Sequence, residues 1–258
     1  MRNSPFKPTA SRDLVASDTA RRYLFVEHRL GPDGTLPSRP PSTGYRTYLV
    51  VAGAVRLVHG GGNQDRVLTP WEGWHAPPGS VFRCAAAGPG DTLLLEAGCV
   101  PESAHPVRPD APEPCHDLSD YAVTKPWGSE VWYTQNAPDC GYVVKRIRME
   151  SGHRSSLQSH RRKTETNYVV EGVAGVLNGV PAPEGPGTPV AVPSAAWTRH
   201  AAGTFWTSPP DTLHRVVAEQ AYTSVEVSTT ELDDVVRWAD DTGRADGRIT
   251  AEHPGGRA

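Results

Sequence analysis

Residues 152–172, GHRSSLQSHRRKTETNYVVEG, decide the fold of this chain. Gln158 and His160 stand two residues apart, so on an extended strand both side chains leave the same face. Glu165 follows five residues after His160, which leaves room for a bend, and it begins a second apolar run. An amide, an imidazole and a carboxylate on neighbouring strands can form a three-ligand metal site. We expect the fourth ligand to be His214, in the segment PPDTLHRV.

The spacing of these residues resembles that of the two cupin motifs. In the first motif, two glycines bracket three metal ligands, and the matching residues here are Gly152, Gln158, His160, Glu165 and Gly172. Glutamine stands where cupins usually carry the first histidine. The second motif is matched by Gly203, Pro209, Asp211 and His214. Asp211 replaces a glycine there, in a turn that tolerates either residue.

Within the cupins, residues 121–246 resemble the cupin-type (type II) mannose-6-phosphate isomerases. The likeness is carried by LQSH before Glu165, by KPWG at 125–128, by VVKRIRM at 143–149 and by EVSTTELDDVVRWADDTGR at 226–244. The resemblance implies a jelly-roll barrel, a bound divalent metal and a phosphorylated sugar as the substrate.

Composition favours an all-β protein with two such barrels. The chain has 258 residues, of which 37% are hydrophobic, with 25 glycines and 25 prolines, and short apolar runs separated by turns suit a barrel or sandwich. We predict two cupin-type (jelly-roll) β-barrels followed by a short C-terminal helix, in which Leu232, Val235, Val236 and Trp238 lie near one face. The predicted segments are a flexible N-terminus (1–20), a degenerate barrel (21–100), a proline-rich linker (101–120), the metal-binding barrel (121–246) and a tail (247–258).

The N-terminal barrel is predicted to have lost its metal site. When Gly53 is aligned with Gly172, the four ligand positions fall on Arg39, Pro41, Arg46 and Phe82. None of these side chains holds a divalent metal, so we expect a structural or dimer-forming barrel. Alternatively, Arg39 and Arg46 bind an anion there.

Charge and cysteine content exclude several classes of function. A net charge of −3 provides no polyanion-binding surface, so no nucleic-acid partner is expected. No run of 18 apolar residues is present, and the N-terminus lacks the apolar core of a secretory signal. The four cysteines form no CxxC pair and are expected to be free thiols. We predict a cytoplasmic protein without membrane contact that acts on a small molecule and could form a homodimer through its barrels.

The predicted ligand set suits zinc first, with iron, manganese, nickel or cobalt as alternatives. A metal with open positions polarises a carbonyl and stabilises an enediolate, which is the chemistry of the aldose–ketose isomerisation implied by the resemblance. Such a reaction needs a base, for which Lys145 is the first candidate and Lys163 the second. The chain has four lysines among its 26 basic residues, and three of them flank the ligand motif. We expect Lys145 to face inward with a lowered pKa, and Arg161 to be available for a phosphate group.

Departures from the isomerase pattern leave two other functions open. Arg161 and Arg162 replace a histidine run, Asn167 replaces an aromatic residue, and the nucleotidyltransferase domain often fused to these isomerases is absent. The first alternative is a tailoring enzyme of natural-product biosynthesis that catalyses oxygenation, dehydration, cyclisation or heteroatom bond formation. The second is a non-catalytic sugar-binding bicupin. The identity of the metal discriminates best among the three.

Overall fold

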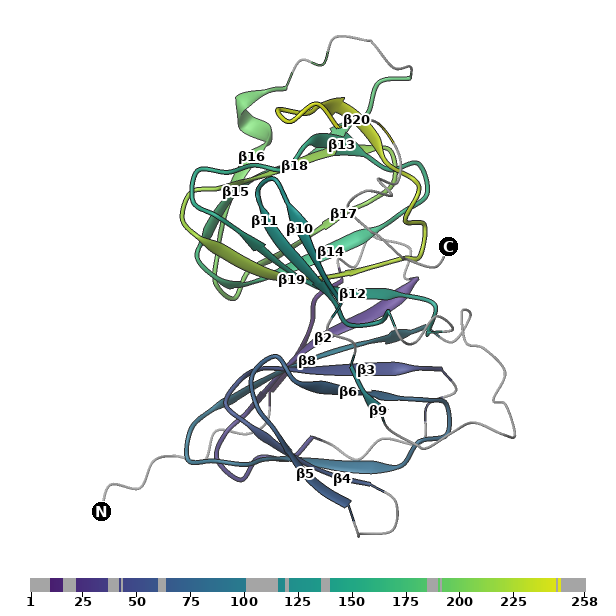
Figure 1. Cartoon of the computed structure of the whole chain (residues 1–258), viewed down its shortest axis with the longest axis vertical. Helices are drawn as coiled ribbons and strands as arrows, with labels where there is room; N and C mark the ends of the chain where they lie inside the picture. The colour runs from purple at the N-terminus through teal and green to yellow at the C-terminus, as the bar shows by residue number, and fades with distance from the viewer. Residues whose placement is uncertain are drawn as a thin grey trace. The chain divides into compact units, whose positions relative to one another are not determined.

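The computed structural model describes residues 10–15, 22–36, 42, 44–59, 64–100, 116–118, 121–135, 140–184, 190, 192–244 and 246. Within these ranges the regular structure consists of β-strands and one 3₁₀ turn, Ser194–Ala196. No helix among them is long and apolar enough to cross a membrane. The chain divides into two compact units, of which the first comprises Met1–Val15, Ala20–Ser119 and Thr134–Tyr142, and the second comprises Ala16–Thr19, Asp120–Tyr133 and Val143–Ala258 (Figure 1).

The first unit contains two antiparallel sheets. The larger sheet has six strands in the order β1 (Ala10–Asp13), β2 (Tyr23–Leu30), β8 (Thr92–Cys99), β3 (Arg46–Ala52), β6 (Gly73–Ala76) and β9 (His116–Asp117). The smaller sheet has the order β5 (Gln64–Leu68), β4 (Val55–His59) and β7 (Phe82–Ala86).

The second unit is also built from two antiparallel sheets. Its six-stranded sheet has the order β10 (Tyr121–Lys125), β11 (Gly128–Trp132), β12 (Val143–Met149), β19 (Tyr222–Ser228), β14 (Glu165–Glu171) and β17 (Phe205–Ser208). Its five-stranded sheet has the order β16 (Trp197–Ala201), β15 (Val173–Pro181), β18 (Thr212–Ala218), β13 (Leu157–Ser159) and β20 (Val236–Ala239).

The two units repeat one strand plan. The order β2-β8-β3-β6 in the first corresponds to β12-β19-β14-β17 in the second, and β5-β4-β7 corresponds to β16-β15-β18. The registers agree, because Tyr48 lies opposite Glu96 in the first unit and Asn167 lies opposite Glu226 in the second. This repetition confirms, at the level of the fold, the prediction of an all-β chain with two cupin-type units, each built from a pair of sheets.

The motif glycine Gly172 has a steric reason in the turn after β14. Its φ is +77°, and a Cβ atom added there would lie 2.0 Å from the carbonyl oxygen of Ala221. Gly53 is the corresponding residue of the first unit, with φ +73°. In the second motif, Asp211 has a φ of 54°, and Gly79, the corresponding residue of the first unit, has a φ of +84°. Aspartate tolerates a positive φ better than most residues do.

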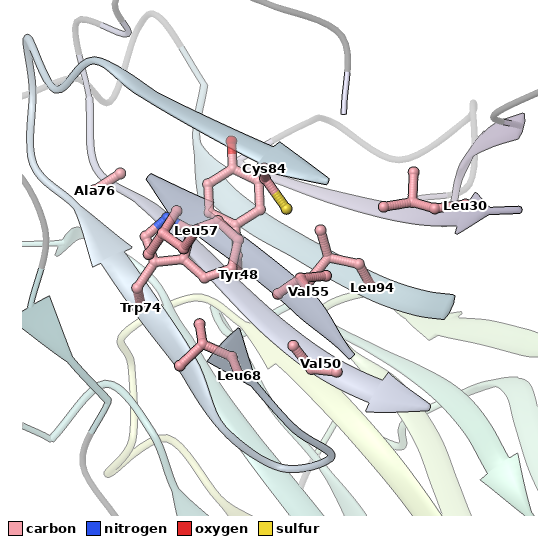
Figure 2. Packing of buried hydrophobic residues seen from close by; sticks show 10 residues of the cluster. All are labelled: Leu30, Tyr48, Val50, Val55, Leu57, Leu68, Trp74, Ala76, Cys84 and Leu94. Atoms are coloured by element: carbon pink, nitrogen blue, oxygen red, sulfur yellow. The ribbon is translucent and has the colours of Figure 1, made fainter. Parts of the chain in front are cut away.

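Each unit has its own apolar core. In the first, the buried cluster of Figure 2 contains Tyr48 stacked on Trp74, with ring centroids 4.6 Å apart. Phe82 meets both rings edge-on, at 5.3 and 5.5 Å. In the second unit one buried cluster contains Trp127, Val169 and other residues of both sheets. These cores hold the two faces of each barrel together.

The predicted C-terminal helix is wrong. Val236–Ala239 form β20, which pairs with β13. Leu232 packs against the cluster around Trp132, whereas Trp238 packs against the cluster around Leu157. The two residues therefore pack in different places, and the helix-like spacing of Leu232, Val235 and Val236 does not reflect one shared face.

Candidate metal centre

The predicted ligands come from strands of both sheets in the second unit. Gln158 on β13 lies directly opposite His214 on β18 in the five-stranded sheet, and His160 follows one residue after β13 ends. Glu165 begins β14 in the six-stranded sheet, between Ser208 and Ser228 of the neighbouring strands. The folding of the motif thus brings residues of two sheets together.

His160, Glu165 and His214 form a buried cluster with ligand atoms within 4.8 Å of one another. The Nε2 atom of His160 lies 3.6 Å from Oε2 of Glu165, and Nε2 of His214 lies 3.3 Å from Oε1. Among the residues that the structure describes, this is the one group of three or more His, Cys, Asp or Glu side chains arranged in this way. The triad could bind a divalent metal.

Hydrogen bonds fix the tautomers of both histidines. His160 donates from Nδ1 to the carbonyl oxygen of Asp234 at 2.5 Å, and His214 donates from Nδ1 to that of Thr212 at 3.1 Å. Because a carbonyl oxygen only accepts, each Nδ1 carries the hydrogen and each Nε2 presents a lone pair toward Glu165. This arrangement is typical of histidines that ligate a metal.

The Nε2 atom of His160 shows that the site fits a cation. It is buried and has no hydrogen-bond partner, a costly state for a polar atom unless a further ligand satisfies it. Burial, reinforced by the charge of Lys163, lowers the pKa of His160 to about 3, so the ring is neutral near pH 7. A neutral imidazole with a free lone pair is the form that binds metals.

Gln158, the predicted fourth ligand, is placed beside the triad with its amide nitrogen inward. That nitrogen lies 3.2 Å from Nε2 of His214, while the amide oxygen accepts a hydrogen bond from the hydroxyl of Ser156 at 2.8 Å. The oxygen would have to exchange places with the nitrogen before it could reach a metal. Gln158 as a ligand therefore stays a prediction.

A series of buried ion pairs begins at Glu165 of the triad and continues to other strands of the sheet. Lys163 Nζ lies 2.6 Å from Oε2 of Glu165 and 3.1 Å from Oε1 of Glu226. Lys145 Nζ lies 3.3 Å from the same Oε1 atom. All of these side chains are less than 12% exposed. Lys145 and Asn167 flank Glu226 in register on the adjacent strands, so the three side chains share one face of the sheet.

The chain of charges continues to a third lysine. Lys145 Nζ lies 3.2 Å from Oε1 of Glu130 and 5.2 Å from the centre of the Trp132 ring. Lys125 Nζ lies 3.7 Å from Oε2 of Glu130. The three lysines that flank the motif in sequence therefore belong to one buried network, in which ammonium and carboxylate groups alternate from Glu165 outward.

The expected low pKa of Lys145 is wrong. Burial alone would lower the pKa, but Glu130 and Glu226 outweigh this effect and raise it. Lys163 behaves in the same way, because burial is outweighed by Glu165 and Glu226 and its pKa is raised. For Glu165, burial alone would raise the pKa, but Lys163 and the two histidines hold it well below its ordinary value. Both lysines are thus ammonium groups near neutral pH.

The remaining candidate, Arg161, has an exposed side chain outside the buried cluster. Its neighbours in the loop are held by Asp234, whose carboxylate accepts hydrogen bonds from the backbone N–H groups of Arg162 and Lys163 at 2.5 and 3.0 Å. Asp234 therefore anchors both the loop and His160. Sequence reasoning missed this role because it assigned Asp234 to a helix.

Glu226 was also missed, although the sequence carries a signal for it. In β19, Ser224, Glu226 and Ser228 alternate with two valines, which indicates one polar face. A carboxylate in the middle of that face, on a strand close to a metal motif, is a reasonable candidate for the site.

The first unit has a different arrangement at the corresponding positions. Arg46 occupies the place of Glu165 and donates from Nη1 to the carbonyl oxygen of Cys99 at 2.6 Å, while its Nε lies 3.5 Å from Glu96. Phe82, in the place of His214, belongs to the aromatic cluster. A fixed guanidinium and an aromatic ring leave no ligand at these two positions. Arg39 and Pro41 lie outside the described residues.

Comparison with known proteins supports the fold. No protein-family model and no curated protein matches the sequence. Among solved structures, the chain is similar to YlbA from E. coli (12% identity, TM-score 0.65, covering 88% of this chain and 86% of that one). The fold is that of a bicupin.

Two other solved structures with a similar fold are of different kinds. Oxalate decarboxylase from Bacillus subtilis, a protein with Mn(II) centres, has 13% identity and a TM-score of 0.63, with 90% of this chain and 75% of that one covered. The coconut allergen cocosin has 12% identity and a TM-score of 0.65, with coverage of 92% and 85%. At these identities the likeness concerns the fold alone, and function must be argued from the site.

Proposed function

We propose that this bicupin is a metal-dependent enzyme that moves a proton next to a carbonyl group of a small oxygenated metabolite, as an aldose–ketose isomerase does. The supporting observation is the buried His160–Glu165–His214 triad, in which both imidazole lone pairs and a carboxylate converge. Gln158 is the proposed fourth ligand. A divalent metal, zinc in the first place, would supply Lewis acidity to the substrate carbonyl there.

Glu226 is the proposed base, in place of Lys145. Both of its lysine contacts are to Oε1, so we assign Oε2 as the atom that takes the proton from the substrate carbon and returns it to the neighbouring carbon. A carboxylate with lysines on one side is held in a fixed position, which a general base requires.

Lys145 and Lys163 are proposed to stabilise negative charge. Each is an ammonium group within 3.3 Å of Glu226, and each can donate a hydrogen bond to an oxygen that gains charge as the proton leaves. Fixed charges in a site shielded from water are effective in this role because they need no rearrangement during the reaction.

One observation favours the biosynthetic alternative over a phosphorylated sugar. Arg161 is exposed, and the guanidinium of Arg244, a second arginine that we consider for phosphate binding, lies 2.8 Å from Asp240. An exposed arginine and an arginine paired with Asp240 make a weak phosphate clamp. A non-phosphorylated metabolite of a tailoring pathway is therefore the second candidate substrate.

The test uses metal-loaded protein, a panel of hexose and pentose phosphates and their unphosphorylated forms, and solvent deuterium. We expect deuterium at C1 or C2 of one sugar. Glu226→Gln should keep its metal and lose turnover by about 10²-fold or more, the usual contribution of a general base. Glu171→Gln is the matched control, because Glu171 lies on β14 but bonds to Thr223 at 2.7 Å instead of the lysines.

Two results would contradict the proposal. If the metal-loaded protein shows neither isomerisation nor deuterium exchange with the whole panel, proton transfer on sugars is excluded and the tailoring alternative takes first place. If Glu226→Gln turns over as fast as Glu171→Gln, the base is another residue.

A further inference from the structure

The first unit contains a hydrogen-bonded line of a serine, a histidine and a glutamate that the proposed metal chemistry does not use. Ser11 on β1 has its Oγ 2.7 Å from Nδ1 of His28 on β2. The other ring nitrogen, Nε2 of His28, lies 2.8 Å from Oε2 of Glu96 on β8. The three residues come from adjacent strands of one sheet.

The direction of each hydrogen bond follows from the chemistry of the groups. A carboxylate only accepts, so Nε2 of His28 carries the hydrogen and donates to Glu96. Nδ1 then presents a lone pair, and the hydroxyl of Ser11 donates to it. This is the protonation state in which an imidazole can remove the proton of a serine.

Glu96 is itself held in place by groups on the neighbouring strand. The hydroxyl of Tyr48 donates to its Oε1 atom at 3.3 Å, and Nε of Arg46 lies 3.5 Å from the same atom. The positive charge of the guanidinium attracts the carboxylate and helps to hold it in place. His28 and Glu96 are both fully buried, so the base and its orienting carboxylate are shielded from water.

Ser11, by contrast, is exposed. Among the described strands β1 lies at the edge of its sheet, and Leu14 donates from its N–H to the carbonyl oxygen of Phe25. Hydrogen-bonded pairs alternate along an antiparallel ladder, so Ser11, three residues before Leu14, turns its own N–H toward the outer edge. A reagent that approaches from solvent can meet the hydroxyl and a backbone donor together.

We propose that Ser11, His28 and Glu96 form a second reactive site, which takes an activated acyl ester. Ser11 Oγ forms a bond to the carbonyl carbon as its proton passes to Nδ1 of His28. The carbon–oxygen bond of the ester breaks, and that proton goes to the leaving alcohol. Water, deprotonated by His28, then releases the carboxylic acid and restores the serine.

The arrangement differs from that of the serine proteases in one respect. There the serine bonds to Nε2 of the histidine and the carboxylate bonds to Nδ1, whereas here the two ring nitrogens exchange partners. Each nitrogen of imidazole can accept a proton, so the exchange changes the direction of approach and leaves the acid–base roles intact.

The test is reaction of the full chain with a fluorophosphonate probe, in which the serine oxygen displaces fluoride from phosphorus. The modified residue is then located by mass spectrometry. We expect Ser11 to react at least about 10²-fold faster than Ser151, the margin typical of general-base assistance. Ser151 is the matched reference, because it is exposed and its hydroxyl bonds to the carbonyl oxygen of Glu219 instead of an imidazole.

Single-residue variants distinguish a reactive Ser11 from a hydroxyl that only forms a hydrogen bond with His28. Ser11→Ala should reduce labelling of the chain to the slow rate of Ser151, and because Ser11 is exposed this change leaves the core intact. Ser151→Ala and His160→Ala should label Ser11 at the parent rate. Retained labelling in His160→Ala makes the result independent of the metal centre. If Ser11 reacts no faster than Ser151, or if Ser11→Ala labels like the parent, the hydroxyl merely satisfies His28 and the proposal is overturned.

Discussion

Replacing Lys163 by methionine should destabilise the second unit strongly. Methionine keeps the apolar stem of the side chain but removes the ammonium group, which lies 2.6 Å from Glu165 and 3.1 Å from Glu226. The lysine is 8% exposed and the two glutamates are 7% and 4% exposed, so solvent cannot replace the lost partner. Breaking a buried pair of this kind costs about 3 to 5 kcal/mol, which corresponds to a fall in Tm of about 6 to 20 °C for a protein of this size.

The assay is urea and thermal unfolding of metal-free protein at pH 7, followed by near-ultraviolet circular dichroism. Arg199→Met is the matched control. Arg199 forms an ion pair with Glu219 at 2.8 Å, but the two side chains are 64% and 42% exposed, and exposed pairs contribute at most about 1 kcal/mol.

The comparison between the two variants tests the reasoning directly. If Lys163→Met loses no more than about 1 kcal/mol, as Arg199→Met should, the lysine does not compensate buried charge. The network of alternating charges would then contribute little to the free energy of unfolding, and the assignment of Lys145 and Lys163 as fixed ammonium groups would fail.

Three further predictions concern stability and metal affinity. The pKa of His160 is about 3 in the folded protein and about 6.5 in the unfolded chain, so the unfolded chain binds more protons between these two pH values. The stability of the metal-free protein should therefore fall as the pH falls from 6.5 toward 3. Urea midpoints measured across this range should fall less steeply for His160→Ala than for the parent protein. Asp234→Ala removes the carboxylate that positions the loop and should weaken metal binding by about 10- to 100-fold in a competition titration, with unchanged affinity counting against that role. Gly172→Ala should destabilise more than Gly79→Ala in thermal melts, because both glycines have positive φ but only Gly172 has an atom 2.0 Å from the added Cβ; equal losses would show that the clash is relieved.

Local spacing was enough to predict the barrels and the triad. The turn after β14 requires Gly172, and the alternation of side chains along β13 places Gln158 beside its partner strand. Such features depend on residues close in sequence within each motif, and His214 was added because the second motif follows the first in the order seen in cupins. The helix was predicted wrongly because Leu232, Val235 and Val236 have helical spacing, whereas Val236–Ala239 form a strand and Leu232 and Trp238 pack against different clusters.

Contacts between distant segments that lie outside the two motifs could not be predicted. The raised pKa of Lys145 depends on Glu130 and Glu226, which reach it from different strands. Ser11, His28 and Glu96 are separated by 17 and 68 residues, and nothing in their local sequence shows that they meet. Only the register of the sheets brings these groups together, and it sets their chemistry.

Elemental analysis of protein purified without chelator tests the central claim most directly. We predict one divalent metal per chain, because the triad of the second unit provides ligands whereas Arg46 and Phe82 stand at the corresponding positions of the first. His160→Ala and His214→Ala should each lose the metal while circular dichroism shows the β-structure retained. Full metal content in both variants, or a metal-free parent protein that fails to take up zinc, iron or manganese on titration, would contradict the assignment.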